Sequence, residues 1–335
     1  MQIKDLVGFS KPLTRLIEVV SQGIGAVSRP YLIRKCADAK AHEVRVIAAA
    51  IKEVAELHHL PVVFKDGEVD VWQTPEDRTL LLDQPDFAGR SDRRVDYQER
   101  KRQGNVESIT AVAAVDLLEQ SEVPEEQPDE DWINRFFRAA EDVSSEQMQE
   151  LWGRILAGEI KKPGSYSLKT LDFVKNLTKS DASLLEKVAS LAVSYAGSSV
   201  VPTPNLEWLK RERGIYPGHH FEASELGAMY PTDLNYRTFR EPETTQEHFS
   251  CGKRILLIDR GTITAEINLP VWQFTKIGRE ILQLIPTDGD QRNLQELGLF
   301  FVQRGATAKL AEITAHLPDG RIEFKNAQNI EAPDK

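Results

Sequence analysis

One stretch near the middle of the chain, residues 151–171 (LWGRILAGEIKKPGSYSLKTL), constrains the fold more than any other. Its apolar side chains recur at three- and four-residue spacing, the pattern of one helical face. Pro163 and Gly164 then end the helix, because proline cannot continue the hydrogen-bond ladder and glycine favours turn conformations. Ser167 follows as a candidate N-cap. The stretch therefore predicts two helices joined by a sharp turn.

We expect the side chains of this central block to act in structure more than in ligand binding. Trp152 belongs to the apolar face, which is typical of a packed core. Glu159 is predicted to accept hydrogen bonds from backbone donors at the cap of the second helix, or to pair with Arg154. The candidate structural and interaction residues of the block are Trp152, Arg154, Glu159, Pro163, Gly164, Ser165, Ser167 and Thr170.

The composition indicates a globular protein of the reduced cytoplasm. Of its 335 residues, 41% are hydrophobic and 28% are charged, which is ordinary for a soluble chain. Cys36 and Cys251 lie far apart and have no metal-ligand spacing, so neither a disulfide framework nor a metal site is expected. The first residues lack the pattern of a signal peptide, and no apolar run reaches the length of a membrane-spanning helix.

The formal net charge of -10 is concentrated in one segment. Residues 119–150 hold eleven acidic and two basic side chains. An acidic balance of this kind argues against a dedicated nucleic-acid-binding protein, which usually presents a basic face. The first 45 residues lean toward positive charge, which fits an anionic lipid surface or the acidic segment of the chain itself.

The distribution of periodic and irregular segments predicts a mainly α fold, with a multi-helix N-terminal and central region and a small α+β winged-helix-like C-terminal module. The expected parts are an amphipathic helix and a long helix (1–60), a linker (61–92), a central helical domain (93–196), an irregular connector (197–252) and the α+β module (253–330).

The winged-helix prediction comes from the order of elements in the last part of the chain. Strands are expected at 254–258 and 262–274, joined by a turn at 259–261, and helices are expected at 275–285 and 290–303. A two-stranded ribbon with a helix on either side is typical of a winged helix, although this is an analogy of pattern alone. A final hairpin is expected around Pro318-Asp319-Gly320.

The N-terminal helix, predicted over residues 12–24, has a strong apolar face with basic residues at its borders and beyond its end. Such a segment can pack in a helical bundle or lie on an anionic membrane surface, and the sequence leaves both open. The candidate residues for membrane or partner contact are Leu13, Arg15, Leu16, Ile17, Val20, Arg29, Arg34 and Lys35.

Catalytic chemistry has little support in the residue pattern. Asp319, Glu323 and Lys325 are similar to a metal-dependent nuclease signature, which needs two carboxylates on one cation and a lysine beside the phosphate. Only three residues separate the two carboxylates here, and Asp319 is better explained as a turn residue. We therefore expect a non-enzymatic protein with no metal and no cofactor.

Two blocks resemble known families. The first is GFSKPLTRLIEVVSQGIG (8–25) with the helix that follows it; the second is RFFRAAEDVSSEQMQELWGRILAGEI (135–160), continuing to Leu177. Together they resemble a bacterial family known as a domain of unknown function and, more distantly, the abortive-infection alpha (Abi-alpha) family of phage-defence proteins. The likeness covers 5–58 and 93–195 well, and beyond 197 only loosely, through residues 274–281 (FTKIGREI). It implies a role in antiviral defence and supplies no catalytic residues.

Three functions follow as hypotheses. The first is a non-enzymatic anti-phage defence component that senses or assembles through its helical core, with contact to the inner membrane as a further expectation. The second is a regulatory adaptor that binds protein or nucleic acid through the winged-helix-like module, and the third is a metal-dependent nuclease. The first predicts self-association or a protein partner, and a cytoplasmic location with peripheral membrane contact.

Overall fold

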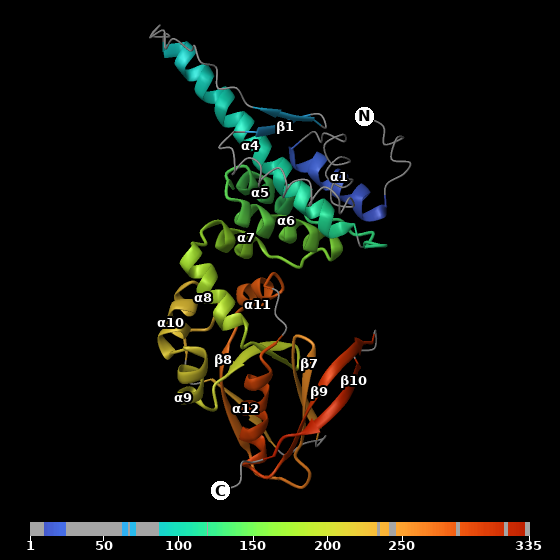
Figure 1. The fold of residues 1–335 in the computed structure, drawn as a ribbon, viewed down its shortest axis with the longest axis vertical. Helices are drawn as coiled ribbons and strands as arrows, with labels where there is room; N and C mark the ends of the chain where they lie inside the picture. Colours follow the sequence, from blue (N-terminus) through green and yellow to red (C-terminus); the bar gives the residue numbers. More distant parts are fainter. Residues whose placement is uncertain are drawn as a thin grey trace. The chain divides into compact units, whose positions relative to one another are not determined.

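The computed structural model describes residues 10–24, 62–65, 68–71, 87–118, 120–232, 235–240, 246–285, 289–317 and 321–331. The chain divides into two compact units, Met1–Tyr166 and Ser167–Lys335 (Figure 1). Each unit is built around its own core, and each is described separately below.

The described part of the first unit consists of helices with one small hairpin. The helices are α1 (Lys11–Ile24), α4 (Phe87–Leu117), α5 (Glu130–Ala140) and α6 (Glu146–Lys161), and the hairpin pairs β1 (Val62–Lys65) with β2 (Glu68–Val71) in antiparallel register. The helix predicted within the central block is α6, and Ser145 caps its start by accepting a hydrogen bond from the Met148 N–H.

Aromatic side chains of α5 and α6 fill the core of this unit. Trp132 stacks on Phe136 with ring centroids 5.0 Å apart, and Phe136 contacts the tilted Trp152 ring at 5.2 Å. The α4 and α6 backbones approach closely at Gly153, where a Cβ atom would lie 2.5 Å from the Val112 side chain. The absence of a side chain at Gly153 therefore allows α4 and α6 to pack this closely.

The second unit is an α+β domain. Its helices are α7 (Leu168–Lys175), α8 (Lys179–Ala189), α9 (Leu206–Trp208) with the π-helical turn η1 (Leu209–Arg213), α10 (Pro217–Glu225), α11 (Lys276–Leu282) and α12 (Gln291–Val302). Its strands are β3 (Val193–Tyr195), β4 (Ser198–Pro202), β5 (Tyr236–Phe239), β6 (Gln246–Cys251), β7 (Arg254–Asp259), β8 (Ile267–Gln273), β9 (Thr307–His316) and β10 (Ile322–Asn329).

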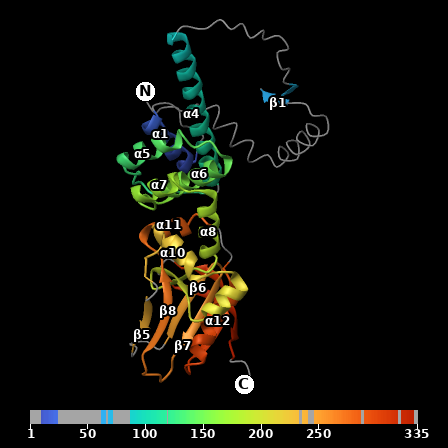
Figure 2. The same cartoon turned by 90° about the vertical axis from the view of Figure 1, so that its left-hand side faces the viewer.

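These strands form one eight-stranded antiparallel sheet in the order β10-β9-β7-β6-β3-β4-β8-β5. Successive side chains point to opposite faces of a strand, so neighbours such as Val200 and Val201 enter different cores. One core lies between the sheet and α12, which runs along the strands in both ribbon views (Figures 1 and 2). Helices α8, α9 and α10 cover the second core on the opposite face of β4 and β8.

The predicted mainly α fold with a small winged-helix-like module is wrong for the C-terminal half. The strand at 254–258 exists as β7, but it pairs with β6 and β9 and not with the next strand. That next strand, β8, pairs with β4 and β5, so the two form no wing. The adaptor hypothesis that relied on a winged helix loses its structural basis.

The segment 197–252, predicted as irregular, contributes β4, β5 and β6 to the sheet. These strands have four to six residues each. Alternation over so few residues gives a weak sequence signal, and β4 and β5 take their places in the sheet by pairing with β8, which is not adjacent to either of them in the chain. Within the described ranges, no helix has an apolar stretch long enough to cross a bilayer.

Candidate functional site

The turn of the central block is held by a buried carboxylate. Glu159 on α6 is 1% exposed, and its two oxygens accept hydrogen bonds from the backbone N–H groups of Gly164 (2.6 Å) and Tyr166 (3.0 Å). Gly164 has a φ of +81°, a conformation that favours glycine. Glu159 therefore binds two backbone donors of the turn that precedes α7.

A second buried carboxylate holds the start of α7. Glu280 on α11 is 5% exposed, and its Oε2 accepts hydrogen bonds from Ser167 N (2.7 Å), Ser167 Oγ (3.0 Å) and Thr170 Oγ1 (2.5 Å). Ser167 occupies the N-cap position, but its hydroxyl makes no capping bond to the α7 backbone. A carboxylate from another helix thus satisfies the donors at this helix start, where negative charge is favourable.

Glu280 is the residue of this site that sequence analysis missed. The sequence feature that could have identified Glu280 is its position in the segment 274–281. There the carboxylate lies on a short helix between the buried residues Gly278 and Ile281. The nearest cation, Lys276 Nζ, lies 3.7 Å from Oε1, and the Lys276 side chain is 70% exposed. The charge of Glu280 is therefore stabilised mainly by the donors of α7.

Most of the remaining candidate residues of the central block are buried in a core or belong to the turn after α6. Trp152 and Thr170 are 0% exposed, whereas Arg154 lies on the exposed side of α6. The Ser165 hydroxyl donates to the Lys162 carbonyl at 2.6 Å, and Pro163 is half-buried in the turn. These residues therefore contribute to packing and to the turn that follows α6.

The apolar face of the N-terminal helix lies inside the first unit. Leu13, Leu16 and Val20 are buried, and α1 contacts α4, α5 and α6. Ile17 is half-buried, and Arg15 donates to the Glu125 carbonyl at 3.1 Å. In this conformation the face belongs to the core. The remaining candidates for membrane contact, Arg29, Arg34 and Lys35, lie outside the described residues.

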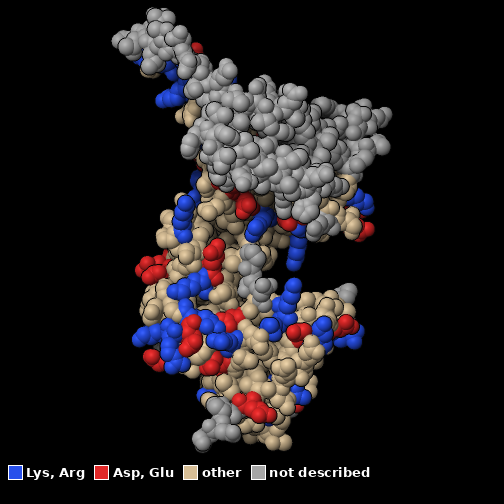
Figure 3. Space-filling model, viewed as in Figure 1, with Lys and Arg blue, Asp and Glu red and all other residues tan. Residues whose placement is uncertain are grey.

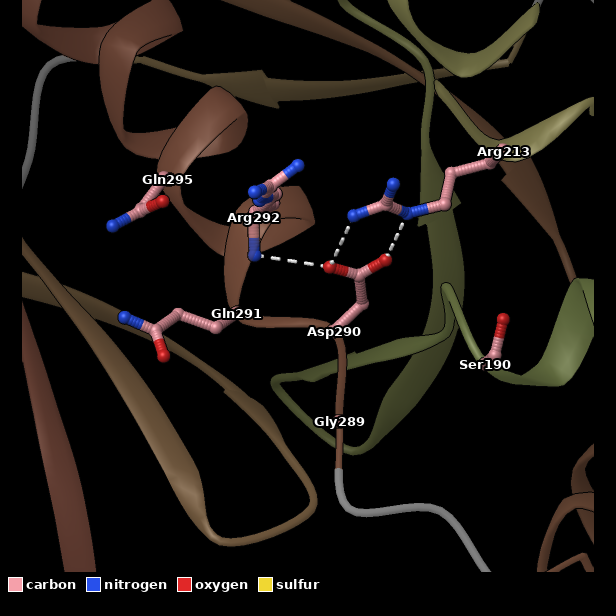
Figure 4. A pocket seen from close by; sticks show the side chains of 7 residues that line it. All are labelled: Ser190, Arg213, Gly289, Asp290, Gln291, Arg292 and Gln295. Carbon is pink, nitrogen blue, oxygen red and sulfur yellow. Dashed lines mark hydrogen bonds and ion pairs between the residues drawn. The ribbon is translucent and has the colours of Figure 1, made fainter. Parts of the chain in front are cut away.

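An open pocket of about 610 Å³ lies at the start of α12 (Figure 4). Its lining residues are Ser190, Arg213, Gly289, Asp290, Gln291, Arg292 and Gln295. Asp290 Oδ1 accepts hydrogen bonds from the N–H groups of Arg292 (2.9 Å) and Asn293 (3.1 Å), and both carboxylate oxygens pair with Arg213.

Asp290 and Arg213 form an ion pair within this pocket. Burial raises the pKa of Asp290, but the hydrogen bonds from Arg213, Asn293 and Arg292 outweigh burial and hold the pKa below its usual range. The Arg213 guanidinium also lies 4.8 Å from the centre of the Trp208 ring. Because Asp290 occupies these two N–H groups of the helix start, the pocket works as a structural cap.

Two of the three residues of the nuclease hypothesis lie on an exposed strand. Glu323 and Lys325 are exposed on β10, and Asp319 lies outside the described residues. Across the residues that the structure covers, no group of three or more His, Cys, Asp or Glu side chains is placed to hold a metal ion.

The N-terminal half of α4 is a helix without buried residues. None of residues 87–104 is buried, whereas buried residues recur at helical spacing from Asn105 onward. This half, which we call the α4 arm, extends beyond the other helices of its unit (Figures 1 and 2). Ion pairs along the arm, Asp96–Arg100 (3.0 Å) and Glu99–Arg102 (2.7 Å), support its helical conformation.

Comparison with known protein families gives a match to the family described as "Protein of unknown function (DUF2806)" over residues 89–298. The matched segment includes all but the first two residues of the α4 arm, the central block and Glu280, whereas the N-terminal helix lies before it. No curated protein and no solved structure matched. Similarity to the Abi-alpha family therefore stays a prediction. Because the match spans more than half of the 335 residues, the chain belongs to the DUF2806 family of proteins of unknown function.

Proposed function

We propose that this protein is a non-enzymatic component of anti-phage defence that acts by assembling with further copies of itself. The resemblance of residues 8–25 and 135–177 to Abi-alpha proteins supports the defence role. The α4 arm supports assembly, because none of its residues is buried over about 27 Å of helix. Most of the stability of a helix in a protein comes from tertiary packing, so the arm gains stability when a second copy covers it.

The charge of the arm indicates what it binds. Residues 87–104 hold six basic and three acidic side chains. Basic side chains of the arm are visible at the upper left of the space-filling view (Figure 3). Its exposed apolar residues, Phe87, Val95 and Tyr97, do not share one helical face. Contact through charge, and not through an apolar seam, is the binding mode that suits this surface.

A second copy of the chain supplies the complementary surface. The segment 119–150 holds eleven acidic and two basic residues, and Glu125, Glu126 and Glu130 are among its exposed carboxylates. The basic arm of one copy and this acidic segment of another have opposite charge. Such pairing would steer association and would weaken as salt rises.

Reversing the charge of the arm should dissociate the assembly. We expect Arg93→Glu with Arg94→Glu to reduce self-association at low salt by about tenfold or more, because like charges would then face the acidic segment. Both arginines are exposed, so folding should be unaffected. Light scattering coupled to size-exclusion chromatography, over a series of concentrations and salt levels, measures the effect.

Two further variants make this test specific. The exposed pair Lys210 and Arg211 of the second unit serves as the matched control, and its reversal to glutamate should leave association unchanged. Glu125→Arg with Glu126→Arg, mixed with the arm variant, should restore association through swapped charges. A wild-type protein that stays monomeric at low salt would refute self-assembly.

The defence role is tested by phage plating on cells that carry the gene in its native operon. Wild type and the control pair should reduce plaque formation, and the arm variant should lose this protection. If all three plate phage like cells without the gene, the defence proposal fails independently of the assembly result.

A membrane step would extend this proposal to the inner-membrane surface. The strongly amphipathic α1 supports it, because its apolar face and flanking basic residues suit an anionic lipid interface. Since this face packs against α4, α5 and α6, lipid contact requires α1 to leave its position.

Gly23→Leu should release α1 and increase lipid binding. A Cβ atom at Gly23 would overlap the buried ring of Phe137, so a larger side chain forces the end of α1 away from α5. We expect more co-sedimentation with anionic phospholipid vesicles, decreasing as salt rises. Gly104→Leu is the control, because nothing lies within 4 Å of that position. Equal binding by the two variants would contradict the membrane step.

A further inference from the structure

Four polar side chains from different elements converge inside the curved sheet of the second unit. Tyr195 comes from β3, Glu247 from β6 and Arg237 from β5, and Arg260 directly follows β7. Arg237 lies two residues before Phe239 and so faces the same side of β5, the side of the α12 core.

Curvature of the sheet brings these elements together. β7 and β5 are separated by four strands in the sheet order, yet Arg260 lies 5.7 Å from the centre of the Phe239 ring. Arg260 Nη1 also donates to the Arg240 carbonyl at 2.7 Å. The Tyr195 ring packs against Phe239 at 5.4 Å, which places its hydroxyl group in the same region.

The hydrogen bonds of the cluster are incomplete. The Tyr195 hydroxyl donates to Glu247 Oε2 at 2.7 Å, and Arg260 Nη2 lies 3.5 Å from Glu247 Oε1. The Arg260 side chain is 2% exposed, and its Nε has no hydrogen-bond partner. Arg237 likewise has buried Nε and Nη2 atoms without a partner in the described structure. Three guanidinium nitrogens therefore remain unsatisfied.

The charges are also unbalanced. Among the described residues, the cluster holds two guanidinium groups and one carboxylate, which leaves an excess of positive charge in a largely apolar interior. Tyr195 adds no negative charge, because burial and its hydrogen bond to Glu247 raise the pKa of the phenol against the opposing effect of Arg260 and Arg237. A buried cation without a counter-charge is costly, and guanidinium groups pair well with planar or tetrahedral oxyanions.

We propose that Arg237 and Arg260 form a binding site for a small oxyanion, a phosphate or carboxylate group, inside the curved sheet. An anion there would accept hydrogen bonds from the unsatisfied nitrogens and neutralise the excess charge. The site is independent of the α4 arm and of the assembly proposed above.

The test is calorimetric titration of the full chain with inorganic phosphate and, separately, with acetate, in chloride buffer of constant ionic strength. Wild type should bind at least one of the two anions and should gain thermal stability from it. Phosphate alone would identify a phosphate site, and acetate alone would identify a carboxylate site. Failure of both anions to bind would overturn the proposal.

Variants locate the binding. Arg237→Met should weaken affinity about ten- to a hundredfold, because charged hydrogen bonds are lost. Arg240→Met is the matched control, since that side chain is 82% exposed three residues away, and its affinity should equal wild type. Arg237→Lys provides a second variant that keeps the charge, in case the methionine variant does not fold; it should bind more weakly than wild type. Equal affinity in all variants would place the anion elsewhere and refute the site.

Discussion

Trp152→Ala is expected to lower the free energy of unfolding of the first unit by about 3–5 kcal/mol. The Trp152 ring is 0% exposed and lies 5.2 Å from the Phe136 ring in the aromatic core. Its loss would leave a cavity between helices that pack too closely to collapse into it. Urea denaturation followed by far-ultraviolet circular dichroism measures the change.

Two variants control for this effect. Trp152→Phe should cost much less than the alanine variant, because the indole Nε1 has no hydrogen-bond partner in the described structure and a phenyl ring keeps most of the contact. Arg154→Ala, on the exposed side of the same helix, should change stability by less than about 0.5 kcal/mol. A Trp152→Ala protein with unchanged stability and lost phage protection would show that the ring binds a partner.

Glu280→Ala is expected to destabilise the second unit by about 2–4 kcal/mol. The substitution removes the acceptor for three donors, Ser167 N, Ser167 Oγ and Thr170 Oγ1, and leaves the buried Thr170 hydroxyl without this bond. The start of α7 would also lose its stabilising negative charge. Denaturation followed by the fluorescence of Trp208 and Trp272, both buried in this unit, measures the change.

The charge and the hydrogen bonds of Glu280 can be separated. Glu280→Gln keeps one acceptor oxygen, so the free energy of unfolding of this variant should lie between those of the wild type and Glu280→Ala. Lys276→Ala should have little effect, because its partner contact is 3.7 Å long and its side chain is 70% exposed. If Lys276→Ala costs as much as Glu280→Ala, the ion pair and not the capping of α7 holds the two helices.

The sequence by itself determined the local structure. Helical periodicity predicted α6, α11 and α12, and the glycine and proline of the central block predicted its turn, because these signals act over a few residues. Thr275, the first residue of the helix predicted at 275–285, is the N-cap of α11, and its hydroxyl accepts a hydrogen bond from the Gly278 N–H at 3.1 Å. Burial of the α6 face followed from its amphipathic pattern.

The tertiary structure decided how distant segments pair. β8 was predicted as a strand, but its neighbours β4 and β5 are chosen by contacts that no local pattern encodes. Glu280 reaches Ser167 across 113 residues, and the curvature of the sheet brings Arg260 to the Phe239 ring on β5, which is separated from β7 by four strands in the sheet order. Local propensity fixes which residues become helix or strand. The partner of a strand edge or of a buried charge depends on which distant groups satisfy its hydrogen bonds, and only the folded chain brings those groups together.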